Sequence, residues 1–460
     1  MPRKVKRDSK KKVYKSTETK SVNHKKFKKG TIKESLAEYR VKQSSPLERI
    51  IDESWDFRKS NTKEYTHCFH SYPAMMIPQV ARRLIENYGS KAKILFDPYC
   101  GTGTSLVEAN LKGINAIGTD INPLARLIAA TKTTKIDVQI LDLFLRQFSD
   151  YFFNLNFQEE EFNQPEIPHI KNIDFWFSKS VQRKLSLLIR FIKEIKDVPI
   201  RNFFNVAFSE TVRESSFVKP GEFKLVRRKN YNEISEPDVY SKMIQKLSRN
   251  RKGLIDFQNS RINGAKTLVL DFNTVDSIPE RILPKNSVDL VVTSPPYGDS
   301  RTTVAYGQFS RLSNEWLGIT NASSIDNSLM GGVRRRHQHQ FNSPVLNEAV
   351  FKIQKLDKER ARDVISFYED YEKSINNIAH TLKKGAYVCY VVGNRTVKGI
   401  KIPTDEITVQ LFEKNDFKHC ETIVRNIPNK RMPLRNSPSN IIGVTASTMK
   451  NEFIVICQKS

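Results

Sequence analysis

Short apolar runs that end at a polar residue punctuate the first third of the chain. The run at 93–96 stops at Asp97, and the run at 115–119 stops at Asp120, about twenty residues later. Between them, residues 105–112 have the apolar spacing of a helix. Buried parallel strands are short apolar runs of this kind, and helices connect them. The pattern predicts a strand, helix and strand of an α/β sheet.

The same pattern returns in the second half of the chain. Further strands are predicted at 266–270, ending at Asp271, at 288–292, ending at Thr293, at 386–392 and at 452–457. Between the two halves, residues 136–262 have helical apolar spacing, clearest at 181–195, and a polar, basic stretch at 213–252. We therefore predict an α/β core that is interrupted by a helical insertion.

Residues 1–45 differ from the rest because they are rich in lysine and poor in apolar side chains. Such a segment cannot bury a core, so the composition predicts a disordered basic tail. The expected organisation is this tail, a first half of the core at 46–135, the insertion at 136–262 and a second half of the core at 263–460. An inserted loop is expected at 318–365 within that second half.

The net charge of the chain indicates what kind of partner it binds. The formal net charge is +26, and residues 1–30 hold 13 Lys or Arg against two acids, a net of +11, which leaves +15 for the remainder. This much positive charge attracts a polyanion and releases its counterions, so nucleic acid is the first candidate. No apolar stretch approaches the roughly 18 residues of a membrane span, and the cysteines form no close pair typical of zinc sites or disulfides. We expect a cytoplasmic protein without a membrane partner or a metal.

The segment after the first strand, at 97–104, has the features of a loop that binds a nucleotide cofactor. Gly101 and Gly103 have no Cβ, so the backbone can turn tightly and a ligand can approach its N–H groups. The segment lacks the third glycine of the dinucleotide fingerprint, which disfavours a dehydrogenase. Asp120 is placed to accept hydrogen bonds from ribose hydroxyls, and Asp271 from an adenine amino group. Taken singly, each acid is equally well interpreted as a helix cap.

A second motif, Ser294-Pro295-Pro296-Tyr297, directly follows the apolar run that ends at Thr293. The exocyclic amine of a nucleobase is a poor nucleophile because its lone pair is delocalised into the ring, so a catalyst needs fixed acceptors that favour a pyramidal nitrogen. Ser294 can supply a side-chain oxygen and Pro295 a carbonyl, and the prolines stiffen the turn. Tyr297 can stack on a base that has left the duplex. We predict that these four residues, called the amine clamp below, are catalytic.

Together the two motifs resemble the S-adenosylmethionine-dependent DNA amino-methyltransferases, which modify cytosine N4 or adenine N6. The amine clamp matches the family's catalytic motif at every position, and residues 70–74 resemble the segment that meets the methionine end of the cofactor. The resemblance implies a Rossmann-like class I methyltransferase with a mostly parallel seven-stranded sheet. It implies these cofactor-binding residues: Tyr72, Pro73, Asp97, Tyr99, Gly101, Gly103, Thr104, Asp120, Asn122, Asp271 and Phe272.

Serine at the first clamp position is typical of cytosine-N4 members, whereas adenine-N6 members usually have aspartate there. The resemblance therefore favours methylation of cytosine N4 in double-stranded DNA by base flipping, in a prokaryotic cytoplasm close to the nucleoid. It also implies a cognate restriction endonuclease as functional partner. An adenine-N6 enzyme, an RNA guanine-N2 methyltransferase and a non-catalytic DNA-binding protein stay open as alternatives. Cytosine-C5 chemistry is excluded, because its cysteine nucleophile usually follows proline and no cysteine here does.

Basic residues of the second half are the candidates for DNA contact. Arginines suit phosphates and guanine edges, and glutamines suit adenine edges, as in the run at 334–340, for which a solvated basic loop is the alternative. No acid or cysteine stands near His337 and His339 in the sequence, so no metal site is expected there. The target sequence is read either by residues 150–260 or by 318–365. The predicted DNA-binding residues are Arg301, Arg334, Arg335, Arg336, Lys430 and Arg431.

Overall fold

A nine-stranded sheet in the order β1-β2-β10-β13-β7-β6-β3-β4-β5 runs through the molecule. The computed structural model describes residues 47–155, 166–299, 303–337, 339–427 and 449–460, and the backbone of 12–14, 435–436 and 446–447. The strands of the sheet are β1 (Lys12–Tyr14), β2 (Arg49–Ile51), β3 (Ile94–Asp97), β4 (Asn115–Thr119), β5 (Thr267–Leu270), β6 (Val288–Thr293), β7 (Leu382–Val392), β10 (Phe417–Asn426) and β13 (Asn451–Lys459).

The strand order reverses at the centre of the sheet. From β3 the chain passes to β4 and β5 on one side, and then to β6 and β7 on the other, with parallel pairing throughout. β13 runs antiparallel between β7 and β10. Open α/β sheets bind ligands at such a reversal, outside the carboxyl ends of the strands. Asp97 and Thr293, which end β3 and β6, stand at this point.

The predicted α/β fold with a mostly parallel sheet is confirmed, with two corrections. The sheet has nine strands rather than seven, because β2 pairs with β10 and β1 pairs with β2 at its edge. Strand β1 falls within residues 1–45, where a disordered tail was predicted. The rest of that tail lies outside the described residues.

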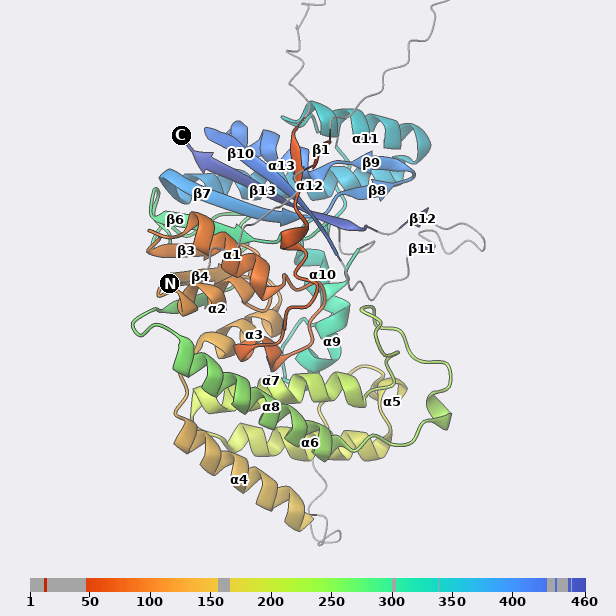
Figure 1. The fold of residues 1–460 in the computed structure, drawn as a ribbon. Coiled ribbons are helices and arrows are strands. Elements are labelled where there is room, and N and C mark those ends of the chain that lie inside the picture. Colours follow the sequence, from red (N-terminus) through yellow and green to blue (C-terminus); the bar gives the residue numbers. More distant parts are fainter. Residues whose placement is uncertain are drawn as a thin grey trace, which may run out of the picture.

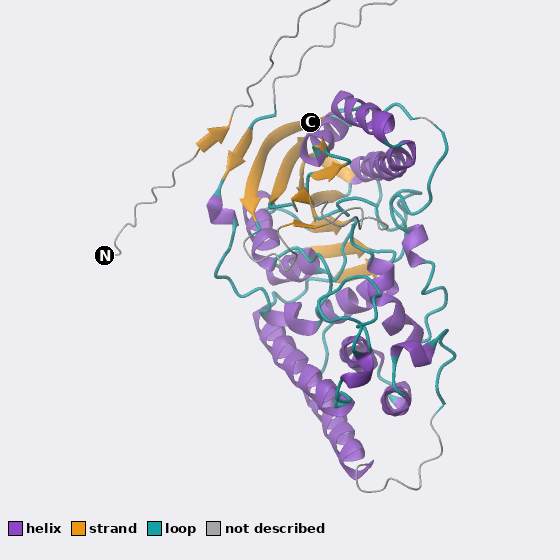
Figure 2. Ribbon diagram, turned by 90° about the vertical axis from the view of Figure 1, so that its right-hand side faces the viewer, coloured by secondary structure: helices purple, strands orange, loops and turns teal. Residues whose placement is uncertain are grey.

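Helices cover both faces of the sheet (Figures 1 and 2). Successive side chains of a strand point to opposite faces, so Leu290 packs in one core and its neighbour Val291 in the other. The first core includes residues of α1 (Pro78–Tyr88), α2 (Thr104–Leu111) and α3 (Pro123–Thr133). The second includes residues of α11 (Pro344–Leu356), α12 (Lys358–Thr381) and α13 (Thr404–Glu413).

The middle of the chain forms a helical layer that lies below α3 in Figure 1. Its core holds many aromatic side chains, among them Phe148, Phe203 and Phe204, and it continues into Trp316 of α9. The helices are α4 (Val138–Leu155), α5 (Ile173–Trp176), α6 (Lys179–Glu194), α7 (Val198–Ser215), α8 (Val239–Ser260) and α9 (Tyr306–Trp316). None of the helices within the described ranges has the length and apolar character needed to cross a membrane.

The second half of the segment 318–365 is helical, where an inserted loop was predicted for the whole segment. It contains α10 (Ile325–Ser328), α11 and the beginning of α12. The reason is that Leu346, Val350 and Ile353 recur at helical spacing and are buried. Two small hairpins complete the fold, β8 (Arg395–Val397) with β9 (Ile400–Ile402), and β11 (Arg435–Asn436) with β12 (Ala446–Ser447).

Candidate active site

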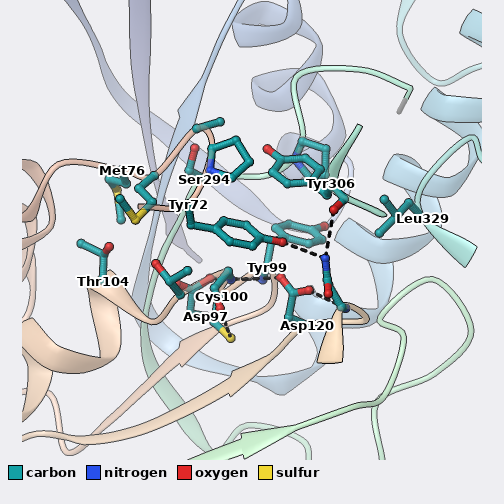
Figure 3. A pocket seen from close by; sticks show the side chains of 17 residues that line it. Tyr72, Met76, Asp97, Tyr99, Cys100, Thr104, Asp120, Ser294, Tyr306 and Leu329 are labelled. Carbon is teal, nitrogen blue, oxygen red and sulfur yellow. Dashed lines mark hydrogen bonds between the residues drawn. The ribbon is translucent and has the colours of Figure 1, made fainter. Parts of the chain in front are cut away.

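A cavity opens at the carboxyl ends of β3 and β6 (Figure 3). Segments far apart in the sequence meet around it, including the glycine loop, the amine clamp and the segment upstream of α1. The lining residues are Tyr72, Pro73, Ala74, Met75, Met76, Asp97, Tyr99, Cys100, Gly101, Thr102, Thr104, Asp120, Asn122, Ser294, Pro296, Tyr306 and Leu329.

Asp97 joins the ends of the two central strands. Its Oδ1 accepts a hydrogen bond from Thr293 Oγ1 at 2.5 Å and one from the Tyr99 N–H at 3.1 Å, and its Oδ2 accepts one from the Ser105 hydroxyl. Burial raises the pKa of Asp97 to about 6, while these hydrogen bonds act in the opposite direction. The carboxyl group therefore fixes the glycine loop against the clamp strand.

The glycine loop is held from the other side by Asp120. Its Oδ2 accepts from the Gly101 N–H at 3.0 Å, and its Oδ1 accepts from the Asn122 N–H at 2.8 Å. Burial raises the pKa of Asp120 as well. The two aspartates thus fix the loop between the ends of β3, β4 and β6, while both of them remain part of the cavity wall.

The two glycines of this loop serve different purposes. Gly101 has a φ of +49°, and a Cβ there would meet no atom within 4 Å, so a ligand in the cavity can approach its backbone. Gly103 has a φ of +78°, and a Cβ there would lie 2.9 Å from the Cβ of Ala129. It does not line the cavity, and its missing side chain instead allows α2 to pack closely on α3.

Aromatic rings form another part of the wall, where Tyr72 lies almost parallel to Tyr306 (Figure 3). The ring centroids are 6.1 Å apart and the planes differ by 17°. Asn122 Nδ2 donates to Tyr72 Oη at 2.8 Å and to Ser310 Oγ at 2.9 Å. The sequence did not single out Tyr306 or Leu329 as site residues. The one sequence signal for Tyr306 was that it is an aromatic residue in the loop that follows the clamp.

The amine clamp lies at the cavity through Ser294 and Pro296. Ser294 Oγ donates a hydrogen bond to the Val391 carbonyl at 3.0 Å and lies 3.3 Å from Tyr297 Oη. Tyr297 Oη donates to Glu452 Oε1 at 3.0 Å. Burial raises the pKa of Tyr297 well above its ordinary value, so its hydroxyl is protonated. Pro295 is buried within the turn, and neither it nor Tyr297 belongs to the lining of the cavity.

Two predicted cofactor residues lie apart from the others. Asp271 follows β5, the outermost strand on that side, and is exposed, while the ring of Phe272 packs against Phe96 at 6.3 Å between centroids. Neither residue lines the cavity. Apart from Gly103, all the other predicted cofactor residues line the cavity: Tyr72, Pro73, Asp97, Tyr99, Gly101, Thr104, Asp120 and Asn122.

The predicted DNA-binding arginines that the structure describes run alongside α12. Arg334 binds Asp363 at 2.6 Å, Arg335 binds Asp370, and Arg336 is exposed. Two of the three guanidinium groups therefore already have acidic partners within the protein. Arg301, Lys430 and Arg431 lie outside the described residues.

The expectation that no acid lies near the histidines is wrong, because α12 supplies acids from later in the chain. His337 Nε2 is 3.0 Å from Glu369 Oε2, and His339 Nε2 is 3.2 Å from Glu372 Oε2. Ligand atoms of both histidines and Glu369 lie within 4.8 Å of one another, a spacing that a metal ion could bridge. Arg335 and Lys373 also bind Glu369, so cationic groups already balance its charge.

The sheet order, the cavity at its reversal and the clamp beside a glycine loop define the Rossmann-like, S-adenosylmethionine-dependent methyltransferases. A profile described as DNA methylase matches residues 3–130. Type II methyltransferase M.MvaI of Kocuria varians is 40% identical over 424 residues, covering 87% of this chain and 92% of that protein. The chain belongs to the DNA amino-methyltransferases of restriction–modification type, and its methyl donor is S-adenosylmethionine.

One more distant relative is also described as a type II methyltransferase. Type II methyltransferase M.BsoBI of Geobacillus stearothermophilus is 21% identical over 443 residues, which cover 82% of this chain and 85% of that protein. A solved SAM-dependent methyltransferase from Methanosarcina mazei aligns at a TM-score of 0.30 and 12% identity, over 85% of this chain and 98% of that one. The residues around the cavity suit the donor, because the backbone at Gly101 is open to a ligand and the half-buried Asp120 stands beside it.

Proposed function

We propose that this enzyme methylates the exocyclic N4 amine of cytosine in double-stranded DNA. The observation that supports this most strongly is Ser294, which stands at the cavity wall at the end of β6 beside Pro296. A neutral hydroxyl at this position can accept a hydrogen bond from an amine without bringing a negative charge to it. The resemblance of a serine-containing clamp to the cytosine-N4 members favours cytosine over adenine.

In this proposal the cavity has two functional ends. The donor, which carries its reactive methyl group on a sulfonium, binds beside Gly101, Asp120 and Tyr72. The target base enters beside Ser294 after leaving the duplex, which costs a few kcal/mol of unpairing and unstacking. Ser294 Oγ and the Pro295 carbonyl accept hydrogen bonds from the amine, so that its lone pair points at the methyl group.

A radiolabelled methyl-transfer assay on unmethylated genomic DNA, followed by digestion to nucleosides and chromatography, tests the proposal. The expected product is N4-methylcytosine, absent with Ser294→Ala and retained with Ser287→Ala near the opposite end of β6. N6-methyladenine would assign the enzyme to adenine instead. Methyl transfer to RNA alone would favour guanine N2, and no transfer to either would favour a non-catalytic DNA-binding protein.

We further propose that the modification protects one short DNA sequence against a cognate endonuclease, in a cytoplasm where the protein stays close to the nucleoid. The helical layer α4 to α8 is our candidate for reading that sequence, because α9 connects it to Tyr306 at the cavity. Base-resolution mapping of the modified positions tests this. A single recurring sequence supports protection of a specific site, whereas scattered methylation contradicts it.

A further inference from the structure

Behind the amine clamp, four neighbouring strands contribute to one line of polar groups in contact. Ser294 follows β6, Val391 lies on β7, Glu452 on β13 and Arg425 on β10, in the order of the sheet. Hydrogen bonds join Ser294 to Val391, Tyr297 to Glu452, and Glu452 to Arg425, and Ser294 Oγ lies 3.3 Å from Tyr297 Oη. A line that reaches the serine of the clamp can determine which hydrogen-bonding roles that serine still has available.

The chemistry of the end groups fixes the direction of each bond. The Val391 carbonyl can only accept, so the Ser294 hydroxyl must donate in their 3.0 Å contact. The Glu452 carboxylate, bound by the Arg425 guanidinium, can only accept, so Tyr297 must donate in their 3.0 Å contact. Because the single proton of Tyr297 is used in this way, it cannot be donated to Ser294.

Glu452 itself is held firmly in place. Its other carboxylate oxygen binds Nη1 of Arg425, whose side chain is 5% exposed and whose Nε donates to the Trp55 carbonyl at 2.9 Å. Side-chain exposure of Glu452 is 18%. A charge pair with this little access to water keeps its geometry, because either partner alone would be costly to bury.

We propose that Glu452 is a positioning residue of the methyltransferase, which acts through Tyr297 to keep Ser294 an acceptor towards the target amine. This inference rests on the proposed function, in which Ser294 accepts a hydrogen bond from the amine. Without the carboxylate, the Tyr297 proton turns towards Ser294 Oγ and competes with the amine for the same lone pairs. The amine then loses an acceptor at the moment it attacks.

The substitution Glu452→Gln tests this with little change of shape. Arg425 has only donors, so it takes the amide oxygen, and the amide NH2 then faces Tyr297 Oη. Tyr297 must in that case donate to Ser294, which creates a hydrogen bond that the wild type lacks. We expect the single-turnover methylation rate to fall about tenfold or more, the effect of about 1.4 kcal/mol on a barrier, with unchanged affinities for DNA and cofactor.

A double substitution separates this effect from a structural one. Tyr297→Phe keeps the ring but removes the competing hydroxyl, so Glu452→Gln combined with Tyr297→Phe should methylate within about twofold of Tyr297→Phe alone. Glu421→Gln is the matched control. Glu421 lies on β10 of the same sheet, away from the cavity, and its carboxylate accepts a hydrogen bond from the Tyr88 hydroxyl. Its rate should equal that of the wild type. Thermal unfolding of every variant verifies folding.

Each possible result of these measurements either supports or overturns the inference. A slow Glu452→Gln that is rescued by Tyr297→Phe supports the inference. A Glu452→Gln variant as fast as the wild type overturns it. So does a double variant that is several-fold slower than Tyr297→Phe alone, because Glu452 would then act independently of Tyr297. A wild-type enzyme that transfers no methyl group to DNA overturns the proposed function and this inference together. A wild type that methylates DNA, with Ser294→Ala inactive and Glu452→Gln as fast as the wild type, overturns this inference alone.

Discussion

At the scale of single residues, Asp120 supports the part of the glycine loop that a ligand can approach. Asp120→Ala removes the acceptor for the N–H groups of Gly101 and Asn122, and leaving a buried donor unpaired costs about 1 to 3 kcal/mol. We expect the affinity for S-adenosylmethionine, measured by calorimetry, to fall about tenfold or more.

Asp271→Ala is the matched control for this substitution, since both acids were predicted as cofactor ligands. Asp271 is exposed and does not line the cavity, so its replacement should leave the affinity for the donor within about twofold. Equal losses in the two variants would show that cofactor contacts reach beyond the cavity described above.

His70 gives a pH dependence to stability. It is 3% exposed, neither of its ring nitrogens has a hydrogen-bond partner among the described residues, and burial lowers its pKa to about 4. Its pKa in the unfolded chain is about 6.5, so protonation favours unfolding, and stability is lost as the pH falls from about 6.5 to 4. At pH 5 the loss should reach about 2 kcal/mol.

Urea unfolding at about pH 7.5 and pH 5 measures this effect. His70→Gln cannot take up the proton, so its free energy of unfolding should fall by about 2 kcal/mol less than that of the wild type between the two pH values. His67, whose pKa burial also lowers, is present in both proteins and contributes equally. Parallel losses in the two proteins would contradict the assignment to His70.

The same residues show how far the sequence could predict the site. Asp97, Asp120 and Ser294 were found because each ends or follows an apolar strand, and a strand end is visible in the sequence. Asp271 also follows an apolar strand, but that strand, β5, lies two positions from β3 in the sheet, so Asp271 lies away from the cavity. The sequence does not show this, because strand order depends on tertiary packing. Tyr306 reaches the cavity through its stacking on Tyr72, a contact between residues far apart in the chain.

At the scale of elements, the packing of segment 334–337 on α12 divides its arginines into two kinds. Arg335 binds Asp370 and Glu369, whereas Arg336 is exposed. Arg336→Ala should weaken DNA binding and lower the slope of log affinity against log salt by about 0.9 for each phosphate that it would otherwise neutralise. Arg335→Ala should instead lower the free energy of unfolding, by up to about 3 kcal/mol, because it leaves Asp370 without its cationic partner.

Fluorescence anisotropy titrations with duplex DNA, from about 50 to 200 mM salt, measure the first effect, and urea unfolding without DNA measures the second. The two variants are controls for each other. If Arg335→Ala lowered the salt slope as much as Arg336→Ala, then Arg335 would exchange its acidic partners for phosphates when DNA binds.

Elements were predicted as well as their local patterns allowed. The central strands are short apolar runs and were placed within a few residues, whereas β10 was missed because its first half, Phe417 to Glu421, is mostly polar. Its buried second half pairs with β13, which begins 25 residues after it ends, so the pairing has no local signal. The segment 318–365 did carry the helical spacing that α11 displays.

At the scale of the whole molecule, the excess of positive charge should control DNA affinity. Residues 1–11, which precede β1, hold six Lys or Arg and one acid, a net of +5. Their deletion should weaken DNA binding mainly at low salt, with a decrease in the salt slope of up to about 0.9 for each phosphate that these residues neutralise. The modified sequence should not change.

Salt-dependent anisotropy and base-resolution mapping of the methylated sites check both halves of this prediction. A matched variant with Lys or Arg to Gln changes in residues 1–11 separates charge from chain length. An unchanged slope after deletion would assign the attraction for DNA to the body of the protein, which keeps a net charge of +15 beyond residue 30.

The order of the strands also determines when the surroundings of the amine clamp can form during synthesis. β13 lies between β7 and β10 and supplies Glu452, yet a ribosome makes it after both of its neighbours. Until then the nascent chain carries a cofactor loop and a clamp, but β7 and β10 each expose an unpaired edge, which invites misassociation. Insertion of β13 closes both edges and connects Tyr297 to its acceptor in one step. Completion of the sheet and completion of the clamp are therefore a single late event in biogenesis.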